Sequence, residues 1–404
     1  MKIYDIKDFG AIGDGLTVNT IAIQTAIDTC AKEGGGKVIV SGGVFVTGTI
    51  FMRSNVELYI DSNATLFASS NSDDFPNFTC DEWDVSLAPR ATAKCIIYFG
   101  FVENASLSGM GKIDCNGKHF CTPVYRDGEI VGYDKDITKT PARMIFIMGS
   151  TNVRIEDVTL TDLAGGWGYW VNNSQLVTFN KAKIYCNQLY PNSDGIHINC
   201  SSDVIVDSCI IYSGDDSIVI RANTNTLKEN RVCERIVVKG CTLSSYCQAV
   251  RIAWRNDGTI KNCTLSDLVI TKSRVGVVIQ LPMYSSPTDF ASNATLVENI
   301  HFNNIIMDEI GFAPIKVLIS DGNLVEAIKN IRFTNVTSNS GDYPLIIGRE
   351  DALIEDVYFN GCKFTINGNR ELPNYTGQFF KHVKGIHLTD TTFDVIGPKK
   401  TWKE

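Results

Sequence analysis

Several features that mark other classes of protein are missing from this sequence. No run of about eighteen apolar residues occurs in it, so it offers no candidate membrane-spanning helix. The first residues, MKIYDIKDFGAIGDG, lack an apolar run behind a basic start, and without that signal we expect a cytoplasmic protein. A net charge of −8 gives no overall basic field for nucleic acid. Neither a membrane nor a nucleic acid is therefore an expected partner.

Cysteine spacings typical of disulfide frameworks or zinc sites are also missing. The 13 cysteines are odd in number and form no paired CxxC or Cys/His cluster, which favours reduced thiols and no zinc site. Three of them recur at one phase of a strand-like pattern, in VDSCII, VKGCTL and IKNCTL. We therefore predict that Cys209, Cys241 and Cys263 are small buried residues.

The sequence does contain a short repeat. From about residue 95, alternating apolar and polar runs return at intervals of roughly 20 to 30 residues, each turning at Asn, Asp, Ser or Gly. The runs are NVRIEDVTLTD, DVIVDSCIIYS, RIVVKGCTLSS, NIHFNNIIMDE, NIRFTNVTSNS, LIEDVYFNGCKF and GIHLTDTTF. Each is too short to bury its apolar face alone, so the repeats must stack as in a solenoid. Stacked strands with turns in register predict an all-β chain folded as a parallel β-helix.

One helix is predicted ahead of the repeats, at about residues 17–33. The segment NTIAIQTAIDTCAKEGGG begins at an Asn19 or Thr20 cap and stops at its three glycines. Its apolar face carries Ile23, Ala26, Ile27 and Cys30. Such a face suits a cap on the exposed end of a β-helix core. No linker or low-complexity segment interrupts the chain, so we predict a single domain, 1–404.

Two stretches place acidic residues ahead of neighbouring repeats. In PNSDGIHINC, Asp194 precedes a β-branched run, and in YSGDDSIVIRA the pair Asp215 and Asp216 precedes the next, with 216 − 194 = 22 residues between equivalent positions. Equivalent positions on successive β-helix rungs lie about 4.8 Å apart. We expect the three carboxylates to meet on one face, where like charges oppose joint ionisation. The alternative is that they are turn caps or a calcium site.

A carboxylic acid beside carboxylates is the equipment of glycoside hydrolysis, in which one group protonates the leaving oxygen and another activates water or attacks the sugar. The sequence motifs agree with this chemistry. The amino-terminal stretch from FGAIGDG to NVELYI, together with GKIDCNGKHF, NSDG at Asn192 and SGDDS at Ser213, resembles the polygalacturonases and their relatives, glycoside hydrolase family 28. NSDG followed by GDD at this separation is the more specific signal.

The resemblance implies a right-handed parallel β-helix and inverting hydrolysis without a metal or other cofactor. It makes Asp215 the general acid and Asp194 and Asp216 the residues that activate water. Their carboxyl groups should lie within about 10 Å of one another, with an acid-to-base separation of roughly 6.5–9.5 Å.

The sequence departs from the family pattern at two motifs. In place of a Gly-His-Gly motif it reads SSYCQAVRIAWRN, with Gln248 or Cys247 at the histidine position, and in place of an Arg-Ile-Lys motif it reads GVVIQLP, with Val278 and Gln280. Strand alternation directs Arg251 outward on the side that carries Val278. Arg251 is then either a replacement ligand for a sugar carboxylate or a solvated or salt-bridged surface residue. The loss of both cations slightly favours a neutral sugar.

Further residues are candidates for binding the oligosaccharide or polysaccharide substrate. They are Asn192, His197, Gln248, Gln280, Trp167 and Trp170, with Arg251 as above. His197 faces outward beside Asp194, so it either bonds the substrate, supports the carboxylates or is a plain surface histidine. The two tryptophans either stack on sugar rings or pack in the core.

The predicted activity is glycoside hydrolysis of a plant-type polysaccharide of the pectin or cell-wall kind. A β-helix polysaccharide lyase or epimerase is the second enzymatic possibility, although no calcium site with a basic partner is evident. A non-catalytic carbohydrate-binding β-helix is the third.

Overall fold

The computed structural model describes residues 2–87, 92–283, 293–368 and 379–396. Within it the chain forms two compact units. The first unit comprises residues 1–197, 203–215 and 226–228, and the second comprises 198–202, 216–225 and 229–404. The boundary thus passes between Asp215 and Asp216, which adjoin in the chain.

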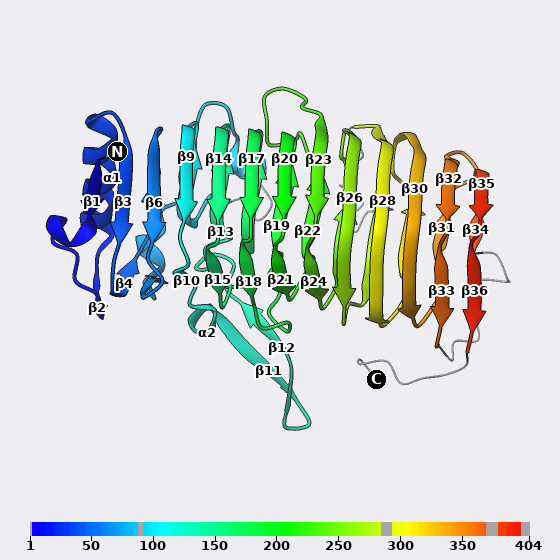
Figure 1. Ribbon diagram of the computed structural model, residues 1–404, viewed down its shortest axis with the longest axis horizontal. Helices are drawn as coiled ribbons and strands as arrows, with labels where there is room; N and C mark the ends of the chain where they lie inside the picture. Colours follow the sequence, from blue (N-terminus) through cyan, green and yellow to red (C-terminus); the bar gives the residue numbers. More distant parts are fainter. Residues whose placement is uncertain (1, 88–91, 284–292, 369–378, 397–404) are drawn as a thin grey trace. The chain divides into compact units, whose positions relative to one another are not determined.

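The first unit is a stack of parallel strands arranged in three series (Figure 1). One series pairs β1 (Ile3–Asp5), β3 (Gly36–Val40), β6 (Val56–Ile60), β9 (Glu103–Ser108), β14 (Thr151–Glu156) and β17 (Gln175–Asn180). A second pairs β2 (Asp14–Val18), β4 (Gly43–Thr47), β7 (Ala64–Ala68), β10 (Lys112–Asp114), β15 (Thr159–Thr161), β18 (Lys183–Tyr185) and β21 (Ile210–Ser213). The third pairs β5 (Ile50–Phe51), β8 (Cys95–Gly100), β13 (Arg143–Met148) and β16 (Trp167–Asn172).

The predicted helix is present as α1 (Thr20–Lys32), and its buried residues are the four named from its apolar periodicity. It packs against β1, β3, β5 and β6 of the first unit (Figure 1). Asn19 precedes the helix, but its side chain bonds Ile12 and Thr17 and makes no cap to the first turn. The glycines follow the helix, where Gly35 N donates to Cys30 O at 2.9 Å. The capping helix is therefore confirmed, while its amino-terminal cap differs in detail.

Asparagine residues shape one corner of the first unit. Asn55, Asn104 and Asn152 have φ values of 63°, 56° and 56°, in the left-handed region that asparagine tolerates better than most residues. Asn104 Nδ2 donates to Asn55 Oδ1 at 3.3 Å, and Asn152 Nδ2 donates to Asn104 Oδ1 at 2.7 Å. The repeated turn residue seen in the sequence thus forms a ladder that holds successive rungs in register.

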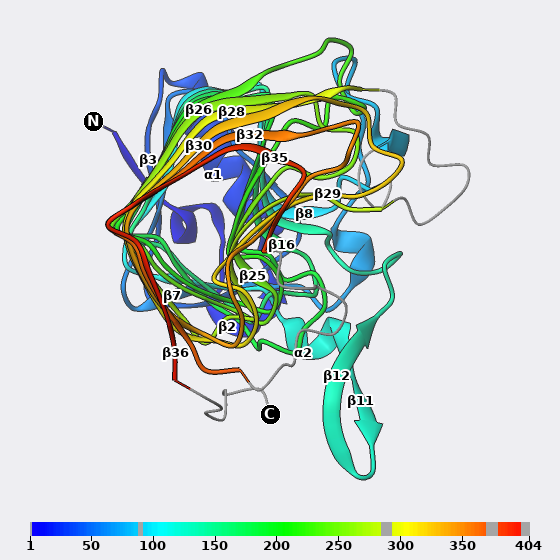
Figure 2. The same cartoon turned by 90° about the vertical axis from the view of Figure 1, so that its right-hand side faces the viewer.

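A hairpin interrupts the regular stack of the first unit. It consists of the antiparallel strands β11 (Cys121–Arg126) and β12 (Glu129–Lys135), preceded by α2 (Gly117–Phe120), and it extends away from the parallel strands (Figures 1 and 2). The register pairs Cys121 with Lys135 at its base. Short 3-10 helices complete this unit: η1 (Ile6–Phe9), η2 (Ser72–Asp74) and η3 (Val85–Leu87).

The second unit repeats the same architecture, and its strands overlie one another in an end-on view (Figure 2). One series contains β23 (Cys233–Lys239), β26 (Thr259–Thr271), β28 (Thr295–Ile310), β30 (Val325–Ser340), β32 (Ile354–Asn360) and β35 (Val383–Thr389), and β24 (Thr242–Ser245), β33 (Lys363–Ile366) and β36 (Thr392–Val395) pair along its continuation. The other contains β22 (Ile218–Arg221), β25 (Gln248–Ile252), β27 (Val275–Leu281), β29 (Ile315–Ile319), β31 (Leu345–Ile347) and β34 (Phe380–Lys381). Strands β19 (Ile196–Asn199) and β20 (Ser202–Asp207) begin in one unit and end in the other.

Equivalent side chains stack inside the second unit. Phe302, Phe333 and Phe359 lie in register on β28, β30 and β32, with ring centroids 4.9 and 5.1 Å apart. Cysteines occupy a second repeated position, where Cys241 and Cys263 each direct Sγ at the carbonyl oxygen two residues earlier. Cys209 of the first unit does the same, and all three are at most 1% exposed. Their predicted role as small buried residues is confirmed.

The chain is an all-β, right-handed parallel β-helix with an amino-terminal capping helix, as predicted. The single domain 1–404 stays a prediction. Within the described ranges, no helix is both long and apolar enough to cross a membrane.

Candidate active site

Backbone pairing fixes the position of Asp194, two residues before β19. Gly168 N donates to Asp194 O at 2.8 Å, and Tyr169 N donates to Gly195 O at 2.9 Å. This approach requires glycine at 168, because a Cβ there would lie 2.9 Å from Gly195 O. Asp194 is 2% exposed. These bonds hold the backbone of the buried Asp194 against β16.

His197 is buried beside Asp194, with Nδ1 3.8 Å from Asp194 Oδ2. Its ring stacks on Trp167 at a centroid distance of 4.0 Å and an interplanar angle of 29°. The Arg143 guanidinium lies 4.9 Å from the centroid of Trp167. Because His197 is only 2% exposed, it is not a plain surface histidine. Its position fits support of the carboxylate.

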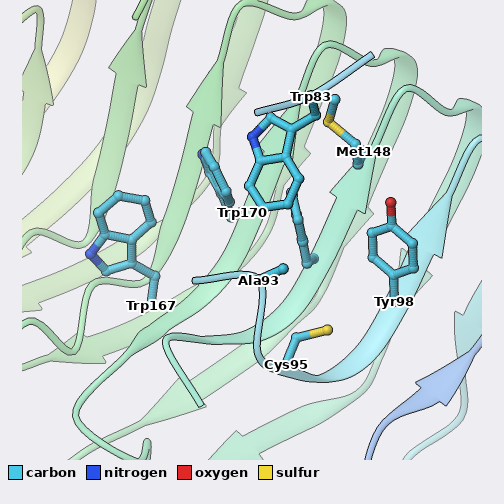
Figure 3. Close-up of a cluster of buried hydrophobic side chains, with 8 residues drawn as sticks. Trp83, Ala93, Cys95, Tyr98, Met148, Trp167 and Trp170 are labelled. Atoms are coloured by element: carbon cyan, nitrogen blue, oxygen red, sulfur yellow. The ribbon is translucent and has the colours of Figure 1, made fainter. Parts of the chain in front are cut away.

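Trp170 lies in the aromatic core of the first unit (Figure 3). It stacks on Phe146 at 4.6 Å and meets Trp83 edge-on at 6.1 Å. The side chain is 1% exposed, so its placement follows the core-packing alternative. Trp167 is 8% exposed and lies apart from the centre of the cluster in Figure 3. Of the two tryptophans, Trp167 is thus the one adjacent to the catalytic candidates.

Asp215 is the least buried of the three aspartates, being only partly buried where Asp194 and Asp216 are buried. Its backbone N donates to Ser193 O at 3.4 Å, and its carbonyl accepts from Ser213 Oγ at 2.7 Å. Gly214 permits this close packing, since a Cβ there would collide with Ser193 Oγ. Asn192 Nδ2 lies 3.4 Å from Asp215 Oδ2. Asn192 and Ser193 of the NSD motif are therefore bonded to Asp215, and all three belong to the first unit.

Asp216 belongs to the second unit and is fully buried. Arg251 Nε lies 3.0 Å from its Oδ2, and Gln248 N donates to its Oδ1 at 3.3 Å. The Arg251 guanidinium carbon lies 4.5 Å from the centroid of the Trp254 ring. Arg251 therefore forms an ion pair within the protein, and its part in binding a sugar carboxylate stays a prediction. The Gln248 contact is made by its backbone.

Strand register relates the position of the missing Arg-Ile-Lys motif to nearby cationic residues. Arg251 pairs with Val278, as expected from strand alternation, and Val278 pairs with Lys316 on the next rung. Lys316 is half-buried, and burial lowers the pKa of its ammonium, with Arg274 lowering it further. Gln280 lies on the same strand as Val278 and is 7% exposed. A cation therefore follows Val278 one rung along the stack.

Sequence reasoning missed Lys316, Arg143 and Lys135. Lys316 alternates with the buried Ile315 and Val317, so the sequence predicts that its side chain points outward. The sequence does not predict that its strand pairs with the strand of Val278. Arg143 is 1% exposed and donates from Nη1 to Thr92 O at 2.7 Å, a contact across the loop before β8. No local pattern signals Lys135, whose partners come from distant loops.

No group of three or more His, Cys, Asp or Glu side chains is arranged to hold a metal in the part of the chain that the structure describes. The chemistry expected here, acid and base catalysis by carboxylates, needs no such site. Independence from metals stays a prediction, as does the convergence of Asp194, Asp215 and Asp216 with the stated separations.

Known proteins resemble this chain in sequence and in fold. A protein described as "Probable polygalacturonase" from Vitis vinifera is 25% identical over 286 residues, covering 68% of this chain and 56% of that protein. An exo-poly-alpha-D-galacturonosidase of Dickeya chrysanthemi is 27% identical over 253 residues, covering 54% of this chain and 41% of that protein. The aligned region thus spans about half the length of these relatives.

Among solved structures, the family 28 exopolygalacturonase of Yersinia enterocolitica superposes with a TM-score of 0.71 at 18% identity, covering 99% of this chain and 79% of that one. At this identity the likeness establishes the fold. A family model, that of the glycosyl hydrolases family 28, matches residues 60–372. This match extends over more than half of the chain, which therefore belongs to glycosyl hydrolases family 28.

Proposed function

We propose that the protein hydrolyses a glycosidic bond in a pectin-type polysaccharide or oligosaccharide, with inversion at the anomeric carbon. Asp215 protonates the leaving glycosidic oxygen, while Asp194 and Asp216 remove a proton from the attacking water. The bond from the anomeric carbon to the glycosidic oxygen breaks as the bond to water forms, and the products are a new reducing end and a free hydroxyl.

The observation that carries the proposal is the unequal exposure of the three carboxylates. Asp215 is partly exposed, as a group that must reach a substrate oxygen should be, whereas Asp194 and Asp216 are buried. Each buried carboxylate lies near a side chain able to stabilise its charge, His197 for Asp194 and Arg251 for Asp216. Membership of a glycosyl hydrolase family and the polygalacturonase names of the relatives support the reaction and the substrate class.

Reducing-sugar release from polygalacturonate and from a panel of neutral pectic oligosaccharides tests this proposal. Wild-type protein should release reducing ends, and Asp215→Asn should not. Accumulation of an unsaturated product absorbing in the ultraviolet would show a lyase instead. Binding of the same glycans without any cleavage would favour a non-catalytic β-helix.

A further inference from the structure

Lys135 closes the base of the β11–β12 hairpin and reaches the loop that carries the NSD motif. Its ammonium donates to Pro191 O at 3.1 Å, to Asn192 Oδ1 at 3.1 Å and to Gly165 O. A lysine ammonium has three protons, so it can donate to all three of these acceptors. One side chain therefore ties the hairpin to two loops that are distant in sequence.

The surrounding backbone is adapted to this lysine. Gly165 has a φ of 64°, and a Cβ at this position would lie 2.8 Å from Lys135 Cδ. The hairpin makes a second contact with the same loop, in which Tyr133 meets Tyr190 edge-on at a centroid distance of 4.7 Å. Tyr190 O in turn accepts from Ser193 Oγ at 2.8 Å. The hairpin and the NSD loop are thus packed as one structural element.

The bond from Lys135 determines how Asn192 faces its other neighbour. An amide offers an oxygen on one side and an NH₂ group on the other. Because Oδ1 of Asn192 accepts from Lys135, its Nδ2 is the atom that faces Asp215, 3.4 Å from Oδ2. Asn192 has a φ of 52°, a conformation that asparagine adopts readily. The result is a chain of contacts from Lys135 through Asn192 to the carboxylate of Asp215.

We propose that Lys135 is a positioning residue for the general acid: it fixes the amide of Asn192 so that an N–H group, and not the carbonyl oxygen, faces Asp215. This inference rests on the proposed function, in which Asp215 is the acid. Without the lysine, the amide is free to turn, and its oxygen then competes for the proton that Asp215 must deliver to the substrate.

Other titratable groups surround this chain of contacts and must stay constant in any test. Burial raises the pKa of the Cys121 thiol to about 12, with Lys135 acting in the opposite direction. Burial also raises the pKa of Tyr190, and Asp162 adds to that rise. The Cys186 thiol, whose pKa burial also raises, bonds Ser193 of the same loop, and Asp194 with His197 follows that loop in the chain. The test variant therefore changes Lys135 alone.

Steady-state kinetics of Lys135→Met on the glycan that wild-type protein cleaves fastest tests the inference. Methionine keeps the length of the side chain and removes the charge. We expect kcat to fall on the order of 10–100-fold, the cost of a misplaced catalytic group, while KM changes less than about twofold. Lys139→Met is the matched control, because Lys139 lies four residues on, is 69% exposed and pairs only with Asp136 among the ion pairs of the described residues.

A double-mutant cycle with Asn192→Ala separates positioning from a general loss of structure. If Lys135 acts through Asn192, Lys135→Met should cost nothing further once Asn192→Ala is present. Equal losses in the two backgrounds, or an effect confined to KM, would overturn the inference. Thermal unfolding of each variant checks that the fold is retained.

Carboxyl ¹³C titration of aspartate-labelled protein tests the positioning role of Lys135 separately from the proposed hydrolase function. The Asp215 signal is assigned by its absence from Asp215→Asn. Lys135→Met should move its titration midpoint to higher pH, and Lys139→Met should leave it in place. If wild-type protein cleaves no glycan, the proposed function is wrong. The titration still shows whether Lys135 acts on Asp215 through Asn192. An unchanged midpoint in Lys135→Met would contradict the inference whatever the activity.

Discussion

Arg251 Nε lies 3.0 Å from Asp216 Oδ2, and the two side chains are 12% and 0% exposed. A buried ion pair of this kind is expensive to break, because removing one partner leaves the other charged group buried without compensation. Arg251 therefore stabilises a carboxylate of the protein itself. Loss of Arg251 should therefore disturb Asp216, whichever substrate is bound.

Arg251→Ala should lower turnover of uronate and neutral substrates alike, because it disturbs Asp216 and not a sugar carboxylate. It should also reduce the free energy of unfolding by roughly 3–5 kcal/mol, as expected for half of a buried pair. Steady-state kinetics on both substrates measures the change in turnover, and urea denaturation measures the change in the free energy of unfolding. Arg255→Ala is the control. Arg255 is a neighbouring arginine whose guanidinium donates to Met283 O at 3.4 Å. A loss confined to uronates would instead show that Arg251 binds the sugar.

Lys316→Met should weaken the cleavage of uronate substrates and leave neutral ones unchanged. Lys316 follows Val278 by one rung and supplies a cation that the sequence motifs lacked, so we expect the substrate to carry a uronate. The loss should be on the order of 1.5–3 kcal/mol, that of a charge-assisted hydrogen bond. Equal effects on both substrate classes would contradict this assignment.

The same lysine predicts a pH dependence. Burial lowers the pKa of Lys316, with a further contribution from Arg274, so its positive charge is lost at a lower pH than that of an ordinary lysine. As the pH rises through this pKa, KM for a uronate should increase while KM for a neutral substrate stays constant. Parallel KM profiles for the two substrates would show that Lys316 has no part in binding.

Removal of divalent cations should leave the activity intact, because proton transfer by carboxylates needs no metal. Assays with and without a chelator test this directly. An ordered ion held by six to eight oxygen ligands at about 2.3–2.6 Å, together with chelator-sensitive activity, would favour a lyase.

The sequence predicted those features that repeat along the chain. The period of the strands, the apolar face of α1 and the burial of Cys209, Cys241 and Cys263 all follow from local alternation, and each is present. The pairing of Arg251 with Val278 was also readable, because it depends only on strand phase and rung order.

What the sequence did not predict are contacts between residues that share no repeat. Lys135 and Asn192 are 57 positions apart, and the lysine comes from a hairpin that interrupts the solenoid. His197 was expected to face outward, yet stacking on Trp167 leaves it only 2% exposed, since the depth of burial depends on neighbouring rungs. The partner of Arg251 depends in the same way on side-chain packing and not on pattern.

Reducing-sugar release by wild-type protein and by Asp215→Asn, on the same pectic substrates and at equal concentrations of folded protein, tests the central claim most directly. The change removes the proton that the acid must donate and keeps the size of the side chain. We predict a loss of about 10²–10⁴-fold, the contribution typical of general acid catalysis. Wild-type rates in Asp215→Asn would contradict the assignment of Asp215 as the acid and, with it, the mechanism.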